Sequence, residues 1–169
     1  MTAEETVAQF HAAAEAGDVD LAMAAFADDI VVHSPLTDRA EFRGHAQVRA
    51  LFEVVYRALA DLRYHTEVGD DRTRALFGTG SVGRQRIDAS LLLRLDDHAK
   101  IVEITLYVRP LPGLATVMAA LGPPLARRYG RSRAVAALVA AMVRPLVAAT
   151  RFGDRVGIPL ALPESGAPR

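Results

Sequence analysis

Residues 16–35 constrain the fold of this chain more than any other segment, because a helix end, a second helix and a strand follow one another there. Gly17 supplies the left-handed residue that ends a first helix, expected over about 3–16. Asp18 offers a side-chain oxygen to the free amides of a second helix, expected over about 19–27. A strand follows and ends at His33-Ser34-Pro35. The order helix, short helix, strand is thereby set.

A third helix is predicted over about 45–60, where apolar residues recur at the spacing of one buried helical face. Beyond Asp61 the period changes to two, which predicts strands over about 63–68, 72–79, 85–95 and 100–109. In the strand over 85–95 the odd-numbered residues from Ile87 to Leu95 are apolar and form the predicted core face. Helices are therefore expected to come first and paired strands to follow.

From Pro110 onward the sequence is rich in Ala, Leu, Val, Arg and Pro and lacks strand-like alternation. It predicts helices over about 114–121, 124–129 and 133–150, the first of them stopped by Gly122-Pro123-Pro124. The change of texture divides the chain into a domain over 1–110 and a helical extension over 111–169, packed on that domain or on a partner.

Three segments together, residues 16–35, Phe42-Arg43-Gly44-His45 and Lys100–Ile104, resemble the nuclear transport factor 2-like superfamily. Its SnoaL-like polyketide cyclases, ketosteroid isomerases and limonene epoxide hydrolases share one fold. The resemblance covers about 1–121. It implies an α+β cone with a strongly curved mixed or antiparallel sheet wrapped around N-terminal helices, followed here by a C-terminal helical extension. This fold carries enzymes, binders and transport factors, so function has to be read from the site.

The amino-acid composition excludes several kinds of functional site. The 169 residues, 51% of them hydrophobic, suit one globular body, and the absence of cysteine excludes disulfides, thiolate nucleophiles and cysteine-ligated zinc. Five histidines lie scattered without metal-binding spacing, so neither a metal site nor a cofactor is expected. The acidic N-terminus lacks a basic and then apolar leader, which favours a cytoplasmic location.

Charge is unevenly distributed. Residues 1–110 hold 12 Lys and Arg against 18 Asp and Glu, whereas residues 111–169 hold 8 against 2. This pattern indicates that the extension folds onto its own domain or a neighbour's. Neutral net charge and the lone Tyr129 among the arginines of the extension argue against nucleic-acid binding. The apolar run Ala134–Val143 is short of the roughly 20 residues needed to span a bilayer, which leaves a buried or partner-packed helix and an interfacial membrane helix open.

Gly78-Thr79-Gly80-Ser81-Val82-Gly83 matches the glycine pattern of dinucleotide sites. Such a site needs a helix after the glycines, to aim its amides at the pyrophosphate. A strand follows here. We therefore interpret the glycines as a bulge or bend in a curved sheet.

The resemblance also implies that the catalytic residues of two related enzyme classes are absent from this chain. Positions matching the catalytic tyrosine, aspartate base and aspartic acid of ketosteroid isomerases hold Phe10, Ser34 and Leu91, which cannot perform that proton transfer. The epoxide hydrolase site has an arginine between two aspartates, and the matching residues are Arg72, Arg74 and Leu106. Both carboxylates that would activate water are absent.

The resemblance implies an interior that is almost purely apolar. His33 is the one residue expected near it that can carry a proton near neutral pH. Because Pro35 keeps Ser34 extended, His33 and Ser34 face opposite sides of the strand, and the sequence leaves open which of them faces the cavity. The predicted ligand-binding residues are Phe10, Val32, Ser34, Phe52, Tyr56, Arg72, Leu91, Ile104 and Leu106.

The leading hypothesis is binding of a small apolar molecule in the cone. One alternative is a cyclase or isomerase that acts on a carbonyl compound with His33 as general base. A third is a non-catalytic interaction module whose cavity is filled by its own side chains. A homodimer through the outer sheet face, which carries Glu103, Thr105, Tyr107 and Arg109, is expected from the resemblance.

Overall fold

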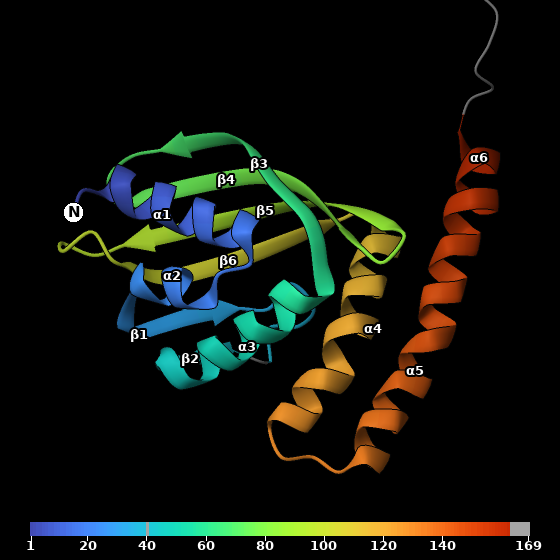
Figure 1. Cartoon of the computed structure of the whole chain (residues 1–169). Helices are drawn as coiled ribbons and strands as arrows, with labels where there is room; N and C mark the ends of the chain where they lie inside the picture. Colours follow the sequence, from blue (N-terminus) through green and yellow to red (C-terminus); the bar gives the residue numbers. More distant parts are fainter. Residues whose placement is uncertain (40, 163–169) are drawn as a thin grey trace, which may run out of the picture.

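The computed structural model describes residues 1–39 and 41–162. Three helices and a six-stranded sheet form the body, and two long helices follow beside it (Figure 1). The elements are α1 (Ala3–Ala16), α2 (Val19–Ala24), β1 (Phe26–His33), β2 (Glu41–Arg43), α3 (Gly44–Ala58), β3 (Leu59–Gly69), β4 (Thr73–Val82), β5 (Gln85–Leu95), β6 (Ile101–Arg109), α4 (Leu111–Arg128), α5 (Arg133–Phe152), a π-helical turn (Gly153–Gly157) and α6 (Ile158–Ala161). The predicted α+β fold with a helical extension is confirmed.

The sheet has the order β2-β1-β6-β5-β4-β3. Only the β1–β6 pair is parallel, with Val32 opposite Ile104, and the other four pairs are antiparallel. The sheet is therefore mixed. This order places β1, which comes first in the chain, beside β6, which comes last, so that residues from both ends of the domain meet at one point.

The helix boundaries follow from local chemistry. Thr2 and Glu5 form a reciprocal capping box at the start of α1, and Gly17 ends this helix with φ of 68°. The Asp18 side chain accepts a hydrogen bond from the Leu21 N–H at 2.9 Å and caps α2. α2 ends at Ala24 rather than at about Ala27, because Phe26 already belongs to β1.

The glycines of β4 lie where β3 is irregular. The pairing of β3 with β4 shifts register on either side of the segment Arg63–Tyr64, and Tyr64 lies opposite Gly78. A β-carbon on Gly78 would lie 2.6 Å from the Arg63 carbonyl oxygen and 2.8 Å from the Tyr64 ring. The bend expected from the glycine pattern is present, and no helix follows the glycines.

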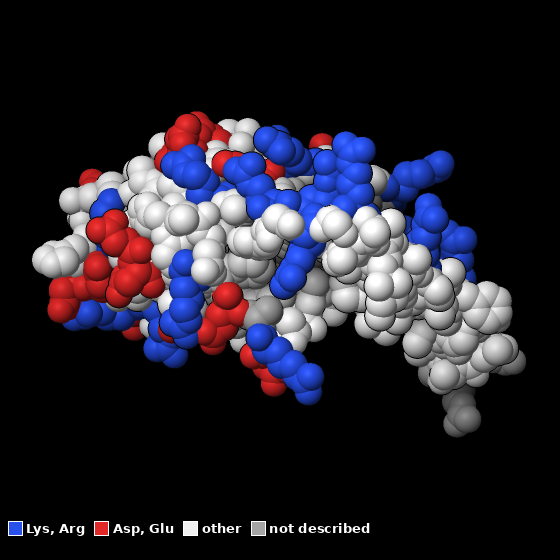
Figure 2. All heavy atoms as spheres, turned by 90° about the horizontal axis from the view of Figure 1, so that it is seen from below, with Lys and Arg blue, Asp and Glu red and all other residues white. Residues whose placement is uncertain are grey.

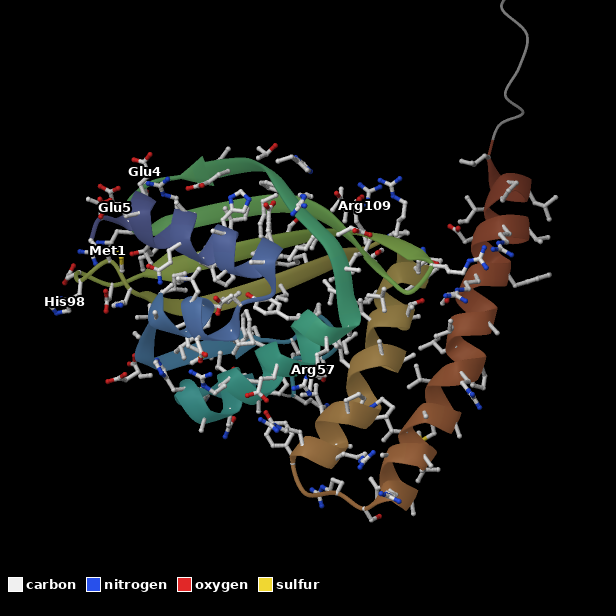
Figure 3. The ribbon with its side chains drawn as sticks, viewed as in Figure 1. Met1, Glu4, Glu5, Arg57, His98 and Arg109 are labelled. Carbon is white, nitrogen blue, oxygen red and sulfur yellow. The ribbon has the colours of Figure 1, made fainter. Side chains whose placement is uncertain are left out.

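The core lies between the sheet and helices α1 to α3. The odd-numbered residues of β5 from Ile87 to Leu95 are buried, as their alternation predicted. Phe10, Phe26 and Phe52 pack ring to ring, with centroids 5.3 to 6.2 Å apart. Charged side chains lie outside this core: Glu4, Arg57 and Arg109 are exposed, and Glu4 and Arg109 point away from the body (Figure 3).

The first helix of the extension differs from the prediction. α4 runs without interruption from Leu111 to Arg128, and Pro123 and Pro124 lie inside it instead of ending it. Proline in a helix interior costs about 3 kcal/mol or more. Packing offsets this cost, because Leu121 before the prolines and Leu125 after them contact the core of the body. Tertiary packing therefore outweighs the local signal.

The second helix of the extension is longer than its apolar run indicates. α5, the π-helical turn and α6 form one continuous helix of 29 residues, Arg133–Ala161, which lies beside α4 (Figure 1). By length and composition alone it is able to cross a membrane, with a mean hydropathy of 1.6 in its most apolar window and 11% of that window buried. The expectation of no membrane span rested on the length of a ten-residue apolar run. That run is much shorter than the helix that contains it.

Candidate functional site

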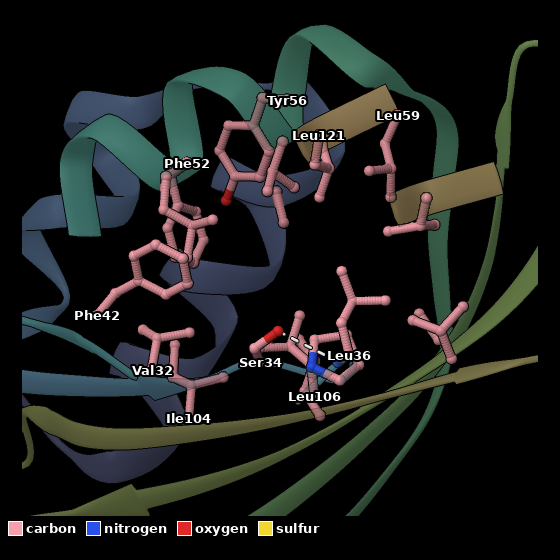
Figure 4. Close-up of a pocket in the computed structure, with 18 of the residues that line it drawn as sticks. Val32, Ser34, Leu36, Phe42, Phe52, Tyr56, Leu59, Ile104, Leu106 and Leu121 are labelled. Carbon is pink, nitrogen blue, oxygen red and sulfur yellow. Dashed lines mark hydrogen bonds between the residues drawn. The ribbon is translucent and has the colours of Figure 1, made fainter. Parts of the chain in front are cut away.

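A cavity of about 260 Å³ lies between the sheet, α1, α3 and α4 (Figure 4). Apolar side chains make up nearly all of its wall. Eight of the predicted ligand-binding residues line it: Phe10, Val32, Ser34, Phe52, Tyr56, Leu91, Ile104 and Leu106. Seven of them come from two helices and three strands, and Ser34 directly follows β1; the sheet order brings them together.

Tyr56 carries the cavity's most distinctive polar atom. Its ring packs edge-on against Phe52, with centroids 5.3 Å apart, and its hydroxyl points from α3 into the cavity (Figure 4). This oxygen is buried and has no hydrogen-bond partner among the described residues. Burial raises the pKa of the Tyr56 phenol, with smaller contributions from Tyr64 and Asp18. The hydroxyl thus stays protonated and is a free hydrogen-bond donor.

Ser34 faces the same cavity from the end of β1. Its Oγ accepts a hydrogen bond from the Leu36 N–H at 3.2 Å, a short turn that also brings Leu36 into the wall (Figure 4). The serine hydroxyl retains its own proton as a donor. Ser34 therefore offers a second, weaker polar contact at the side opposite Tyr56.

His33, which was considered as a general base, lies outside the cavity. Its Nδ1 lies 3.5 Å from Glu41 and its Nε2 lies 3.2 Å from Glu103, on the outer face of the sheet. The three side chains line a separate, more open depression together with Thr105 and Asp38. Val32 faces inward, so strand alternation turns His33 outward and Ser34 inward.

Arg72 is also absent from the cavity wall. It lies in the turn between β3 and β4, where its guanidinium pairs with Asp97 of the neighbouring turn. The turn between β3 and β4 is organised by Asp70, whose carboxylate accepts hydrogen bonds from the backbone N–H groups of Arg72 and Thr73. These bonds lower the pKa of Asp70. The position matched through short sequence anchors thus falls at a turn, away from the interior.

Residues that the sequence analysis did not assign to the site also line the cavity. They come from α4, which contributes Val117, Leu121 and Leu125, and from the segment after β1, which contributes Leu36 and Phe42. The helical spacing of the α4 residues was a usable signal. This spacing spans the two prolines, and the sequence-based expectation that Pro123 and Pro124 end the helix separated Leu125 from the other two residues.

The wall limits the chemistry available. Among the described residues that line the cavity, none is acidic, basic or a histidine. Phe10, Ser34 and Leu91, which match the catalytic positions of ketosteroid isomerases, do face the interior, without the groups that proton transfer at a carbon acid needs. In the described part of the chain no three His, Asp or Glu residues are grouped to hold a metal ion. Apolar burial and hydrogen-bond donation remain.

Comparison with known proteins agrees with this picture. A SnoaL-like domain model matches residues 7–104, which is more than half of the 169-residue chain. The chain belongs to the SnoaL-like domain family. A search of curated protein sequences found no match.

Solved structures show the same fold. A protein of unknown function with a cystatin-like fold from Silicibacter pomeroyi is 22% identical, with a TM-score of 0.66 over 69% of this chain and 82% of that one. A steroid delta-isomerase from Pseudomonas aeruginosa is 27% identical, with a TM-score of 0.64 over 75% and 90%. An epoxide hydrolase/cyclase-like enzyme of pyran ring formation in salinomycin is 19% identical, with a TM-score of 0.55 over 63% and 90%. The α+β cone is therefore shared with isomerases, cyclases and proteins of unknown function.

Proposed function

We propose that this protein binds a small, mostly apolar molecule in the cone and orients it with one hydrogen bond from Tyr56. The observation that carries the proposal is the buried Tyr56 hydroxyl, which has no partner among the described residues and points into an apolar cavity. A buried donor without an acceptor costs about 1–3 kcal/mol, and a ligand oxygen placed there removes that cost. The ligand therefore carries a carbonyl, ether or hydroxyl oxygen.

The cavity volume limits ligand size. A volume of about 260 Å³ is many times the ~10–15 Å³ of such space that one water molecule needs. This supports a small organic ligand, and probes of one or two rings are a suitable first size. Affinity arises mainly from removing apolar surface from water, at ~25 cal/mol per Å², and the tyrosine selects orientation.

Binding is favoured over catalysis because the wall supplies a donor and no base. A cyclase or isomerase would need a proton acceptor beside the bound carbonyl compound. His33, the base considered for that role, faces Glu41 and Glu103 on the other side of the sheet. The open volume supports binding over a cone filled by its own side chains.

A homodimer through the outer sheet face remains our proposal. Phe77, Ser90 and Tyr107 form a row across β4, β5 and β6, and the two aromatic rings are 38% and 57% exposed. Such a patch at the centre of a half-polar face suits an interface. If Tyr107→Arg halves the mass measured by light scattering, the face is the interface. An unchanged dimer mass would contradict the proposal.

The test of binding uses two bicyclic probes of suitable size, α-tetralone and tetralin, which differ at the carbonyl group. We expect calorimetric titration to show tighter binding of the ketone in the native protein. Tyr56→Phe should weaken ketone binding about fivefold and leave tetralin binding unchanged. A native mass spectrum of the purified protein adds an unbiased readout, since a retained ligand appears as excess mass.

Two variants serve as controls. Tyr107→Phe removes a hydroxyl from the outer face and should leave both affinities unchanged. Leu106→Trp fills the cavity and should abolish binding of both probes. A Tyr56→Phe variant that keeps the full ketone preference would overturn the role of the tyrosine. Equal binding by the Leu106→Trp variant would place the ligand elsewhere.

A further inference from the structure

The cavity and the open depression beside His33 share one wall. Residues 34–37, which directly follow β1, line both of them. Among the described residues that line the cavity, Thr37 is the one that is exposed, whereas the others are buried or half-buried. The cavity wall is therefore most open to solvent at this segment. We call residues 34–37 the gate segment.

The gate segment is held by local hydrogen bonds. The Leu36 N–H donates to Ser34 Oγ at 3.2 Å, and the Arg39 N–H donates to Thr37 Oγ1 at 3.1 Å. Among the described residues, no backbone–backbone hydrogen bond joins the gate segment to a strand or a helix. A segment with few bonds to its surroundings opens at a low cost in free energy. The main contact to be given up is that of the Leu36 side chain with the cavity wall (Figure 4).

Another part of the wall, formed by α4, is fastened to the body at the end of that helix. Arg128 forms an ion pair with Glu53 of α3. The Tyr129 hydroxyl donates a hydrogen bond to the Gln47 carbonyl oxygen at 3.2 Å, and the Tyr129 ring stacks on Phe42 with centroids 6.3 Å apart. Charge supports this attachment, because acidic side chains gather on the body while the C-terminal helices show white and blue surface (Figure 2). Movement of α4 breaks several contacts, and movement of the gate segment breaks few.

We infer that the depression is the entrance of the cavity and that the gate segment moves aside to admit the ligand. This inference rests on the proposed binding function. The depression has a polar rim that includes Asp38, Glu41, Glu103 and Thr105, so a ligand stays hydrated there until it passes the gate segment. Withdrawal of Leu36 opens the apolar wall, and its return closes the wall over the ligand. Because opening precedes both entry and exit, the gate segment limits the rates of association and dissociation.

The first experiment compares two leucines of the cavity wall in the full-length protein. NMR exchange spectroscopy measures the rates at which α-tetralone binds and leaves. Leu36→Ala should speed association about fivefold, because the gate segment loses its contact with the wall. Leu125→Ala makes the same change at a half-buried position of α4 and should leave the association rate unchanged, so that any loss of affinity lies in dissociation. Faster association in Leu125→Ala but not in Leu36→Ala would overturn the inference and place the entrance at α4.

The second experiment blocks the depression from outside. The chain contains no cysteine, so Thr105→Cys supplies a single thiol in the depression, which a polyethylene glycol maleimide modifies after folding. The label should slow association and dissociation about tenfold each. The calorimetric affinity should stay the same, because Thr105 does not line the cavity. The matched control, Thr66→Cys, carries the same label at an exposed position of β3, outside both the depression and the cavity, and should exchange α-tetralone at native rates.

Two further results would count against the entrance, and they are distinguishable. Native exchange rates in the labelled Thr105→Cys protein would show that the ligand enters elsewhere, with the proposed binding function intact. Absence of α-tetralone binding to the native protein in calorimetry would overturn the proposed function and the entrance with it. The unlabelled Thr105→Cys protein separates the effect of the label from that of the substitution, and we expect it to exchange α-tetralone at native rates.

Discussion

His33 and Glu103 approach to 3.2 Å on the outer face of the sheet, while the next residue, Ser34, lines the cavity on the other side. Both partners are about one-third exposed. We expect His33→Ala to leave the binding of α-tetralone unchanged and to lower the free energy of unfolding by less than about 1 kcal/mol. Calorimetric titration and urea denaturation measure the two effects. A large loss of binding would return His33 to the site.

Tyr56→Phe should separate stability from binding. In the empty cavity the Tyr56 hydroxyl is buried without a partner, so its removal should raise the free energy of unfolding by about 1 kcal/mol. The same change should weaken ketone binding. Denaturation in the absence and presence of α-tetralone compares the two. If the empty variant is less stable than the native protein, the hydroxyl has a partner in solution.

Alkaline pH should destabilise the protein through its buried phenols. Burial raises the pKa of Tyr56 and Tyr64 above their usual value of 10.0 in the folded state. Their contribution is therefore complete below pH 10 and declines as the pH rises, because the unfolded chain loses these protons first. Tyrosinate absorbance followed together with circular dichroism checks this. Ionisation of both residues in a still folded protein would contradict it.

Gly78→Ala should weaken the sheet. A β-carbon there meets the Arg63 carbonyl oxygen at 2.6 Å, and backbone cannot yield as a flexible side chain does. We expect a loss of about 1–3 kcal/mol in the free energy of unfolding. Gly83→Ala makes a comparison, because its β-carbon meets nothing within 4 Å and its cost comes from φ of 57°. A smaller loss at Gly78 than at Gly83 would argue against the close approach.

Much of the body is predictable because short signals fix it. Gly17 and Asp18 mark one helix end and one helix start, and alternation along β5 assigns its core face. The resemblance then places Phe52 and Ile104 at one interior. Those two residues face the cavity because the periodicity of their own segments and the arrangement of these segments in the fold both turn them inward.

Two features, the position of Arg72 and the path of α4, differ from the expectation because they depend on contacts between residues that lie far apart in the sequence. Arg72 was matched through short anchors, and a slip of few residues moves a side chain from a strand to a turn. The path of α4 depends on its packing against the body, which overrides two prolines. The orientation of His33 was within reach, since Val32 is apolar and its neighbour must face the other way.

Part of the cavity wall lies beyond the segment that the family model matches. The family match stops at residue 104, yet Val117, Leu121 and Leu125 of α4 form part of the wall. Under the proposed function, ligand preference is thus partly encoded outside the shared domain. Substitutions along one face of α4 can change the shape of the cavity while the sheet stays the same. Under the proposed function, members of the family with the same cone therefore need not bind the same molecule.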